Sequence, residues 1–212
     1  KAFTYRVGFN LSDSQAKITK YDLNPDGNIG DHYVGEKIGE IWGFVTDGFY
    51  STDEEAAGVD NSDIWGGKWL AGDVRYKNLN GDKTADGKDI ISKGHSKLQD
   101  PGDRKIIGNN TARYNYGISL SAEYKNFDFS CLMQGVGKRD LMLGGAYFWG
   151  FTDEWRTPTT EQLDYWTPDN PNAYYPRQRF GGGGNFQSQT KYLQNGAYMR
   201  MKQLTLGYRK HC

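Results

Sequence analysis

The stretch of sequence that decides the fold is Arg113-Tyr-Asn-Tyr-Gly-Ile-Ser-Leu-Ser-Ala-Glu-Tyr124, then Lys125-Asn126, then Phe127-Asp-Phe-Ser-Cys-Leu-Met-Gln134. In its first part every even-numbered position is apolar or aromatic, and every odd-numbered position is polar or glycine. An alternation with a period of two predicts a β-strand over 113–124 with one apolar and one polar face. The next two residues fit the loop of a tight hairpin, since asparagine tolerates a positive φ.

The residues after the loop predict an antiparallel partner strand over 127–136. Directly opposed residues of such a pair share a face. The opposed apolar pairs are Tyr124 with Phe127, Ala122 with Phe129, Leu120 with Cys131, and Ile118 with Met133. The other face carries Glu123, Asp128, Ser121, Ser130, Ser119 and Gln134. A register shifted by one residue would turn every one of these side chains to the wrong side, so the pairing is strongly specified.

Three further strands are predicted, over 3–12, 16–22 and 197–208. The first alternates cleanly, with Phe3, Tyr5, Val7, Phe9 and Leu11 on one face. The last begins with Met199 and Met201 on one face and continues with Leu204, Leu206 and Tyr208 on the other. This change of phase at Lys202-Gln203 indicates a β-bulge. The segments 23–110 and 137–195 are expected to be long loops.

The composition limits the class of protein. The 212 residues carry 26 basic and 26 acidic side chains, so the net charge is zero and a basic nucleic-acid surface over the whole molecule is excluded. The 10 Phe, 15 Tyr and 6 Trp argue against disorder, and the 28 Gly leave little room for ordinary helices. No apolar run is long enough for a transmembrane helix. Cys131 and Cys212 indicate no disulfide framework.

The alternation fits two architectures about equally well, one sheet of a soluble β-sandwich or part of the wall of a membrane barrel. The predicted strands exceed the roughly 5–6 residues that are usual in soluble proteins, which favours the barrel. Short turns that alternate with long loops are also typical of outer-membrane barrels. We therefore expect an all-β fold of antiparallel strands from the wall of a large outer-membrane β-barrel, with long extracellular loops.

Enzymatic chemistry finds little support in the sequence. His32, His95 and His211 are isolated from one another and from paired cysteines, so no metal-site motif is present. The run Gly181–Gly184 lacks the Lys-Ser/Thr that follows the glycines of a phosphate-binding loop, and it reads as a flexible loop. No two carboxylates are paired in the sequence for glycosidic acid–base work. We expect a protein that is not an enzyme.

A series of segments carries a resemblance to a known family. They are Lys37-Ile-Gly-Glu-Ile-Trp-Gly-Phe-Val-Thr-Asp-Gly-Phe-Tyr50, Gly72-Asp-Val-Arg-Tyr-Lys-Asn-Leu-Asn-Gly-Asp82, Asp103-Arg-Lys-Ile-Ile-Gly-Asn109, Tyr124-Lys-Asn-Phe-Asp-Phe129, Gln134-Gly-Val-Gly137, Trp166-Thr-Pro-Asp-Asn-Pro-Asn172, Tyr175-Pro-Arg177 and Tyr198-Met-Arg-Met-Lys-Gln-Leu-Thr-Leu-Gly-Tyr208. In this order and spacing they resemble the SusC/RagA family of TonB-dependent outer-membrane transporters. The resemblance covers nearly the whole chain from Phe3 onward.

The resemblance implies a barrel of about 22 strands with a plugged lumen, in the outer membrane of a Gram-negative bacterium. Such proteins import oligosaccharides or peptides, driven by the TonB complex, together with a SusD-like surface lipoprotein. No plug domain and no TonB-contact segment is recognisable here, and the predicted strands are fewer than the roughly eight that close the smallest barrel. We expect an internal or carboxy-proximal segment of a larger transporter. Its apolar strand faces should meet lipid, its polar faces the lumen, and its long loops the outside and the SusD-like partner.

All six tryptophans lie in the predicted loops. Aromatic ring faces pack against the C–H surfaces of sugars, so the candidate ligand-binding residues are Trp42, Trp65, Trp69, Trp149, Trp155 and Trp166. Loop aromatics also form the local cores that hold large loops together, and this alternative stays open. The alternative function for the chain is a soluble β-sandwich glycan-binding module with these Trp-rich loops as its site.

Residues 78–89 resemble a calcium-binding loop in their spacing. Oxygen-bearing side chains stand at positions 1, 3, 5, 7, 9 and 12, as in an EF-hand, and they are Asn78, Asn80, Asp82, Thr84, Asp86 and Asp89. Lys83 stands where an EF-hand has glycine, and Asp89 is shorter than the usual bidentate glutamate. Any calcium affinity is therefore expected at the weak end, about 10⁻⁴–10⁻³ M. The alternative is a loop of Asx turns, in which these side chains bond their own backbone. No cofactor is required.

Overall fold

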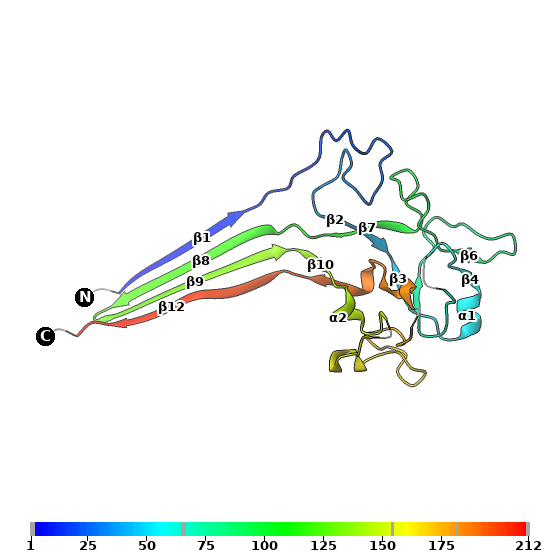
Figure 1. Ribbon diagram of the computed structural model, residues 1–212. Helices are drawn as coiled ribbons and strands as arrows, with labels where there is room; N and C mark the ends of the chain where they lie inside the picture. Colours follow the sequence, from blue (N-terminus) through cyan, green and yellow to red (C-terminus); the bar gives the residue numbers. More distant parts are fainter. Residues whose placement is uncertain (1–2, 65–66, 154, 181, 211–212) are drawn as a thin grey trace. The chain divides into compact units, whose positions relative to one another are not determined.

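The longest strands form one antiparallel sheet in a computed structural model that describes residues 3–64, 67–153, 155–180 and 182–210 (Figure 1). In sheet order they are β1 (Thr4–Ser12), β8 (Arg113–Tyr124), β9 (Phe127–Lys138) and β12 (Tyr198–Tyr208). The chain divides into two units. The sheet belongs to the first, the sheet unit, made of residues 1–16, 109–141 and 195–212, and the loop unit comprises 17–108 and 142–194.

The predicted hairpin is confirmed together with its register. Tyr124 lies opposite Phe127, Ala122 opposite Phe129, Leu120 opposite Cys131, and Ile118 opposite Met133. The second strand runs on to Lys138. On either side of this hairpin, β1 pairs with β8 and β12 pairs with β9, both antiparallel.

One residue of the hairpin loop has a left-handed backbone. Lys125, and not Asn126, takes the positive φ, at 54°. A left-handed backbone costs a non-glycine residue about 1–2 kcal/mol. The Lys125 ammonium lies 5.1 Å from the centre of the Tyr124 ring. This cation–π contact offsets part of the cost and explains why a lysine is tolerated at this position.

The bulge predicted in β12 is confirmed, but its consequence is the opposite of the one expected. Met201 lies opposite Met133, and Gln203 lies opposite the next residue, Leu132, so Lys202 is the extra residue. One extra residue restores the phase of the alternation in space. The expectation that the methionines and leucines occupy opposite faces was therefore wrong, and one face holds Met199, Met201, Leu204, Leu206 and Tyr208.

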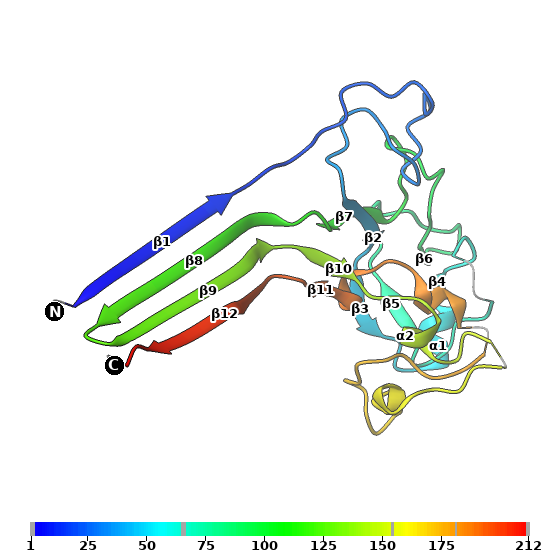
Figure 2. The ribbon, with the colours of Figure 1, turned by 60° about the vertical axis from the view of Figure 1, so that its left-hand side comes forward.

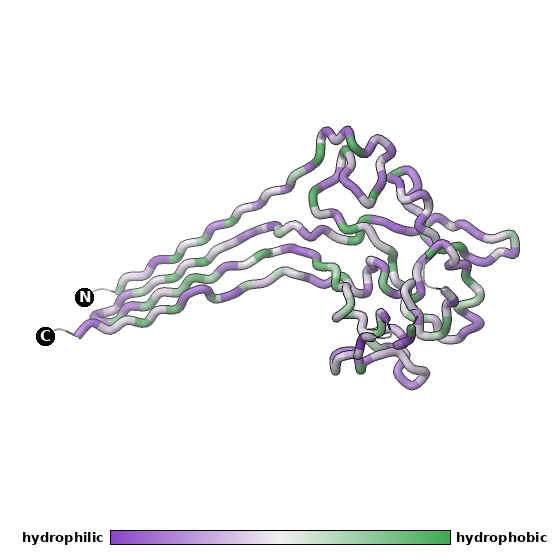
Figure 3. Tube along the Cα trace, viewed as in Figure 1, coloured by the Kyte–Doolittle hydropathy of each residue, from purple (hydrophilic) through white to green (hydrophobic). Residues whose placement is uncertain are grey.

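The sheet consequently has two chemically distinct sides, and Figure 3 shows the alternation of hydropathy along its strands. What we call the apolar face consists of Tyr5, Val7, Phe9, Leu11, Tyr116, Ile118, Leu120, Ala122, Tyr124, Phe127, Phe129, Cys131, Met133, Met199, Met201, Leu204, Leu206 and Tyr208. The opposite side, the polar face, is mainly glycine, serine, amide and charged residues. Side chains of the apolar face on the outer strands β1 and β12 stay largely exposed, such as Tyr5 at 70%, Phe9 at 67% and Leu206 at 78%, whereas those in the middle of β8 and β9 are mostly half-buried.

The expectation of a strand over 16–22 was wrong. Only Lys17 in this segment makes a β-bridge, an isolated one with Lys37. The backbone of Ile18 bonds Glu36 and Gly35 instead of a neighbouring strand. Ile18 cannot extend the sheet because both of its backbone groups are already used within the loop unit.

The segments predicted to be long loops contain short elements of their own (Figure 2). Three pairs of short strands are β2 (Glu40–Phe44) with β7 (Arg104–Asn109), β3 (Thr46–Phe49) with β5 (Val74–Tyr76), and β4 (Val59–Asp60) with β6 (Asp89–Ile90). A fourth is β10 (Asp140–Met142) with β11 (Leu193–Asn195). The helical elements are α1 (Asp53–Ala57), α2 (Ala146–Trp149) and 3₁₀ turns over Thr160–Leu163, Gly183–Phe186 and Thr190–Tyr192. None of the helices among the described residues could span a bilayer.

A predominantly aromatic core holds the loop unit together. Its buried members are Phe44, Phe49, Tyr50, Ala56, Ile64, Trp69, Val74, Tyr76, Ile91, Trp149, Trp166, Ala173 and Tyr192. The rings meet edge to face, as in Trp149 with Tyr192 at 4.8 Å between centroids, or stack, as in Phe44 with Tyr76 at the same distance. Such pairs each add about 0.5–1.5 kcal/mol beyond the burial of their area.

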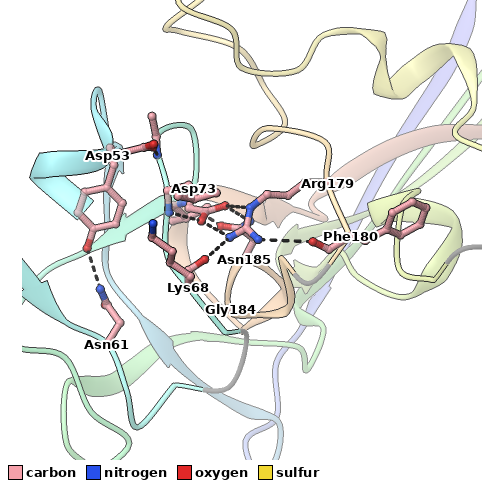
Figure 4. A network of polar contacts seen from close by, with 12 residues as sticks. Asp53, Asn61, Lys68, Asp73, Arg179, Phe180, Gly184 and Asn185 are labelled. Carbon is pink, nitrogen blue, oxygen red and sulfur yellow. Dashed lines mark hydrogen bonds and ion pairs between the residues drawn. The ribbon is translucent and has the colours of Figure 1, made fainter. Parts of the chain in front are cut away.

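A buried ion pair ties together the two chain segments that make the loop unit (Figure 4). The Asp73 carboxylate, with its side chain 1% exposed, accepts hydrogen bonds from the Arg179 guanidinium at Nε and Nη2. It also accepts from Asn185 Nδ2 at 2.9 Å and from the backbone N–H of Leu70 at 2.8 Å. Asn185 Oδ1 in turn accepts from the N–H of Val74 at 2.7 Å. Every oxygen of the buried carboxylate is thus occupied, which is the condition under which a buried charge is tolerated.

We expect the substitution Asp73→Ala to lower the free energy of unfolding by about 3–5 kcal/mol, because it leaves the Arg179 charge without its buried partner. Urea unfolding of the purified protein, followed by tryptophan fluorescence, measures this because Trp69 and Trp149 lie in the same core. The matched control is Asp169→Ala at an exposed position, expected to change stability by less than about 0.5 kcal/mol. Equal stability of the two variants would contradict the structural role of the pair.

Candidate functional site

A polar pocket of about 430 Å³ opens on the loop unit beside α1. Its wall includes Asp53, Glu54, Tyr165, Trp166, Arg177 and Gln178. These residues come from two distant parts of the chain, the start of α1 and the segment 165–178. The pocket therefore combines two carboxylates, a guanidinium, an amide and aromatic rings in one concave surface, as small-molecule sites do.

Local sequence fixes the α1 side of the pocket. Thr52 caps α1, and its side chain accepts the N–H of Glu55 at 3.1 Å. The Glu55 carboxylate reaches back to the N–H of Ser51, which completes a reciprocal arrangement similar to a capping box. Asp53 then accepts the N–H of Ala71 at 2.8 Å, so one of its oxygens anchors the neighbouring turn. The capping bonds fix the position of α1, and the Glu54 carboxylate in this wall takes no part in them.

Gly72 allows the second wall to approach the first. Its φ is +85°, and a Cβ at this position would come within 2.4 Å of the Trp166 ring and 2.6 Å of Arg177 Cβ. Its N–H donates to the Tyr50 carbonyl at 2.8 Å, and its carbonyl accepts the N–H of Arg177 at 2.9 Å. Any side chain at Gly72 would therefore push the Trp166 and Arg177 wall away.

Two buried tyrosines in the core of the loop unit brace the surrounding chain. Burial raises the pKa of the Tyr76 and Tyr192 phenols well above the ordinary value, so both hydroxyls stay protonated at neutral pH. Tyr76 donates to the carbonyl of Gly184 at 2.8 Å, and Tyr192 donates to the carbonyl of Tyr174 at 2.9 Å. These bonds hold Tyr174 within the pocket segment 165–178 and Gly184 shortly after it.

The pocket offers polar groups that other side chains leave available. Among the described residues, neither the Glu54 carboxylate nor the Arg177 guanidinium has a hydrogen-bond or ion-pair partner, and both residues are exposed. Tyr165 is 37% exposed, whereas Trp166 is 6% exposed and supplies a rigid wall. The pocket can therefore accept hydrogen bonds from a ligand at Glu54 and donate them from Arg177, and an aromatic ring can pack against one side of the ligand.

The predicted ligand-binding tryptophans fall into separate environments. Trp69, Trp149 and Trp166 lie in the buried core, so most of their ring surface packs against protein. Trp42 is partly buried and donates its indole N–H to the Tyr33 hydroxyl at 3.1 Å. Trp155 is 87% exposed, and Trp65 lies outside the described residues. Of the five tryptophans that the structure describes, only Trp166 lines the pocket, and three have the packing role that the sequence left open.

Several pocket residues were missed from the sequence. Glu54 follows Ser51-Thr52, and the Thr-x-x-Glu spacing of 52–55 is a helix-start signal that could have located α1. Arg177 stood only among the motifs that carried the family resemblance, whereas Trp166 was also one of the predicted ligand-binding tryptophans. No pattern in the sequence shows that they meet α1, because the two segments are joined only through tertiary contacts.

The predicted calcium loop is internally bonded. Asn78 Oδ1 accepts the N–H of Gly81, and Asn80 Oδ1 accepts the N–H of Asp82 at 3.0 Å. The Lys83 ammonium lies 3.0 Å from the Asp89 carboxylate. Of the remaining two candidates, the Thr84 hydroxyl accepts the N–H of Lys88 and Asp86 is exposed. No group of three or more His, Cys, Asp or Glu side chains converges on a common point among the described residues.

We expect a calcium affinity for this loop no tighter than about 10⁻⁴ M, because an ion must displace Lys83 from Asp89 and break the Asx turns. Calorimetric titration of the full-length protein with calcium, compared with Asp82→Ala, measures it. Heat that corresponds to a micromolar site and is lost in the variant would contradict this expectation.

Comparison with known proteins gives a consistent result. No protein-family model matches the chain. It is 26% identical over 227 aligned residues to TonB-dependent receptor P3 of Formosa agariphila, an alignment that covers 97% of this chain and 20% of the receptor. Its fold matches a structure of the RagAB peptide importer in the closed-closed state with a TM-score of 0.59 and 19% identity, over 98% of this chain and 21% of that one.

The chain thus spans about a fifth of the length of each relative. The all-β antiparallel fold expected from the strand pattern is confirmed by the likeness to the RagAB structure. The resemblance carried by the sequence motifs is confirmed as well: over nearly its whole length, the chain resembles a SusC/RagA-like segment of a TonB-dependent receptor.

Proposed function

We propose that the chain is a segment of a TonB-dependent outer-membrane transporter of a Gram-negative bacterium. In this proposal the strands of the sheet unit form part of a β-barrel wall, with the apolar face toward lipid and the polar face toward the lumen. The similarity to a TonB-dependent receptor over 97% of the chain supports the proposal. The segment by itself serves as a structural part of the transporter, and it carries out no catalysis.

The single observation that carries the proposal is the arrangement of tyrosines on the exposed apolar face. Tyr5, Tyr124 and Tyr208 lie near the hairpin end, Tyr116 lies toward the other end, and no tyrosine stands between them on this face. Residues 116 to 124 span about 27 Å at roughly 3.4 Å per residue. When tilted by about 40°, this length gives a band of about 20 Å, close to the roughly 25 Å apolar band between the aromatic girdles of outer-membrane barrels.

The polar face suits a lumen wall. Gly8 packs on Ser119, and Gly117 packs on the Asn10 amide, where a Cβ would come within 2.8 Å. Short side chains at these positions leave space in the lumen of the proposed barrel. Lipid, by contrast, would require this face to be apolar.

The alternative, a soluble β-sandwich glycan-binding module, is less well supported. A sandwich buries the inner face of each sheet against a second sheet. Here Phe9 on β1 is 67% exposed and Leu206 on β12 is 78% exposed, so no second sheet among the described residues covers the large apolar side chains of the outer strands. An exposed apolar surface of this extent requires a partner, and a bilayer is the partner that the belt of tyrosines fits.

For the complete transporter we propose import of a glycan or peptide nutrient, powered by the TonB complex through parts of the protein beyond this segment. The loop unit would face the outside and contact a SusD-like surface lipoprotein. The structurally similar RagAB is a peptide importer, and this supports the proposal of transport. Two highly exposed aromatics, Tyr147 at 88% and Trp155 at 87%, offer the kind of side chain that is enriched at interfaces.

The bulge provides a test of the membrane-facing wall. Deletion of Lys202 removes the extra residue, so Met199 and Met201 turn to the polar face or the register of β12 slips. We expect the deletion in the full-length transporter to abolish the folded, heat-modifiable form in outer-membrane fractions, whereas Lys202→Ala keeps it. A deletion variant that assembles at the level of the unmodified protein would refute the proposed orientation. Recovery of the unmodified protein in the soluble fraction would refute the membrane location.

The partner contact has its own test. Trp155→Ala in the full-length transporter is expected to weaken capture of the SusD-like lipoprotein by about thirtyfold, the effect of losing one interface hot spot of about 2 kcal/mol. Trp155→Phe, which keeps an aromatic ring, is the matched control and should retain most of the binding. Unchanged capture of the lipoprotein by both Trp155→Ala and Tyr147→Ala would show that these two exposed aromatics are not part of the contact.

A further inference from the structure

We propose that the pocket between α1 and the segment 165–178 binds a neutral saccharide of one or two rings. The inference deepens the proposed function, because it assigns to the loop unit a recognition site for the chemical class of the nutrient. The site consists of Asp53, Glu54, Tyr165, Trp166, Arg177 and Gln178. Its volume of about 430 Å³ lies in the range of about 300–1,000 Å³ that is usual for small-molecule sites.

The charges of the pocket favour a neutral ligand rich in hydroxyl groups. A hydroxyl both donates and accepts hydrogen bonds, so neighbouring hydroxyls can donate to the Glu54 carboxylate and accept from the Arg177 guanidinium. An anionic ligand would meet two carboxylates, and a cationic ligand would meet the guanidinium. Charge-assisted hydrogen bonds are about twice as strong as neutral ones, so a polyol gains from both kinds of group at no cost in net charge.

The aromatic wall fits the other half of a sugar ring. The C–H groups on one side of a pyranose form an apolar surface that packs on an aromatic face. Tyr165, at 37% exposed, presents part of its ring, and the buried Trp166 beside it fixes the wall. Trp166 is held by its backbone N–H, which donates to the Tyr175 carbonyl at 3.0 Å.

A peptide is a poorer match for the same surface. Extended peptides are commonly bound by pairing with the edge of a strand, which supplies alternating N–H and C=O groups. None of the residues that line the pocket lies in one of the strands of the described chain. Pro168, also in the wall, has no N–H to donate. The pocket therefore recognises its ligand through side chains.

The site is organised before a ligand arrives. The Asp53 bond to the N–H of Ala71, the Thr52 cap and the close approach at Gly72 fix the two walls through backbone contacts. The hydrogen bonds of Asp73 with Arg179 and Asn185 fix the chain directly after the lining residues Arg177 and Gln178. Binding then requires little ordering of the protein, which reduces its entropic cost.

The test uses saturation-transfer NMR on the full-length transporter in detergent, with glucose, galactose, mannose, maltose, cellobiose and lactose as probes. Galacturonic acid and the dipeptide Ala-Ala are the charged comparators. We expect at least one neutral sugar to bind, and we expect Glu54→Gln and Arg177→Met each to weaken that binding about tenfold, as loss of one charge-assisted hydrogen bond would. The matched controls are Glu161→Gln and Arg156→Met, exposed positions outside the pocket that should leave binding unchanged.

Three outcomes would overturn the proposal: no neutral sugar binds, sugar binding is indifferent to both pocket variants, or Ala-Ala or galacturonic acid shows the sensitivity to those variants instead. Unfolding midpoints of all four variants, measured in parallel, separate loss of the site from loss of the fold. Each of these outcomes leaves the outer-membrane location intact, since fractionation and heat-modifiability test it separately. Sugar binding by a protein found in the soluble fraction would refute the transporter and retain the pocket.

Discussion

The register between β8 and β9 is the constraint on which the sheet unit depends. Because side chains alternate with a period of two, the pairing of Leu120 with Cys131 decides the face of every other residue in the hairpin. β1 and β12 then extend the same two faces outward. The bulge at Lys202 preserves this register. The alternation in the sequence of β12 shifts by one residue there, and the extra residue keeps the apolar side chains on the same face. A single connected apolar surface results from one hairpin and two strands that are distant from it in the chain.

The loop unit obeys a different rule. Few of its backbone N–H groups are paired within helices or sheets, so buried carboxylates accept some of their hydrogen bonds. Asp103, 0% exposed, accepts the N–H groups of Leu79, Asn80 and Ser92, and thereby joins two separate segments of the chain to its own. Asp73 does the same for Leu70 and adds a pair with Arg179. Buried acceptors of this kind substitute for a sheet ladder, and the aromatic core supplies the hydrophobic contribution.

Sequence reasoning succeeded where structure is local and periodic. The hairpin register and the position of the bulge follow from alternation alone, and so does the all-β class. It failed over 16–22, where a few residues suggested a strand but the backbone bonds Glu36 and Gly35. It anticipated that loop aromatics could form a local core but not which residues meet, because contacts such as Asp73 with Arg179 leave no periodic trace in the sequence. The pocket shares this difficulty: Thr52 and Glu55 mark α1 locally, but nothing local links Glu54 to Arg177.

The distance along the chain between Asp73 and Arg179, 106 residues, has a consequence for the order of folding. The first half of the loop unit lacks its ion-pair partner, and it also lacks Tyr192 and Trp149 from its core, until the second half has been made. Closing so large a loop is entropically unfavourable until many contacts form together. The hairpin of β8 and β9 can form without any distant segment, because its strands are joined by a loop of two residues. The early part of this chain should therefore remain unfolded while it is synthesised and delivered, and the loop unit should mature last.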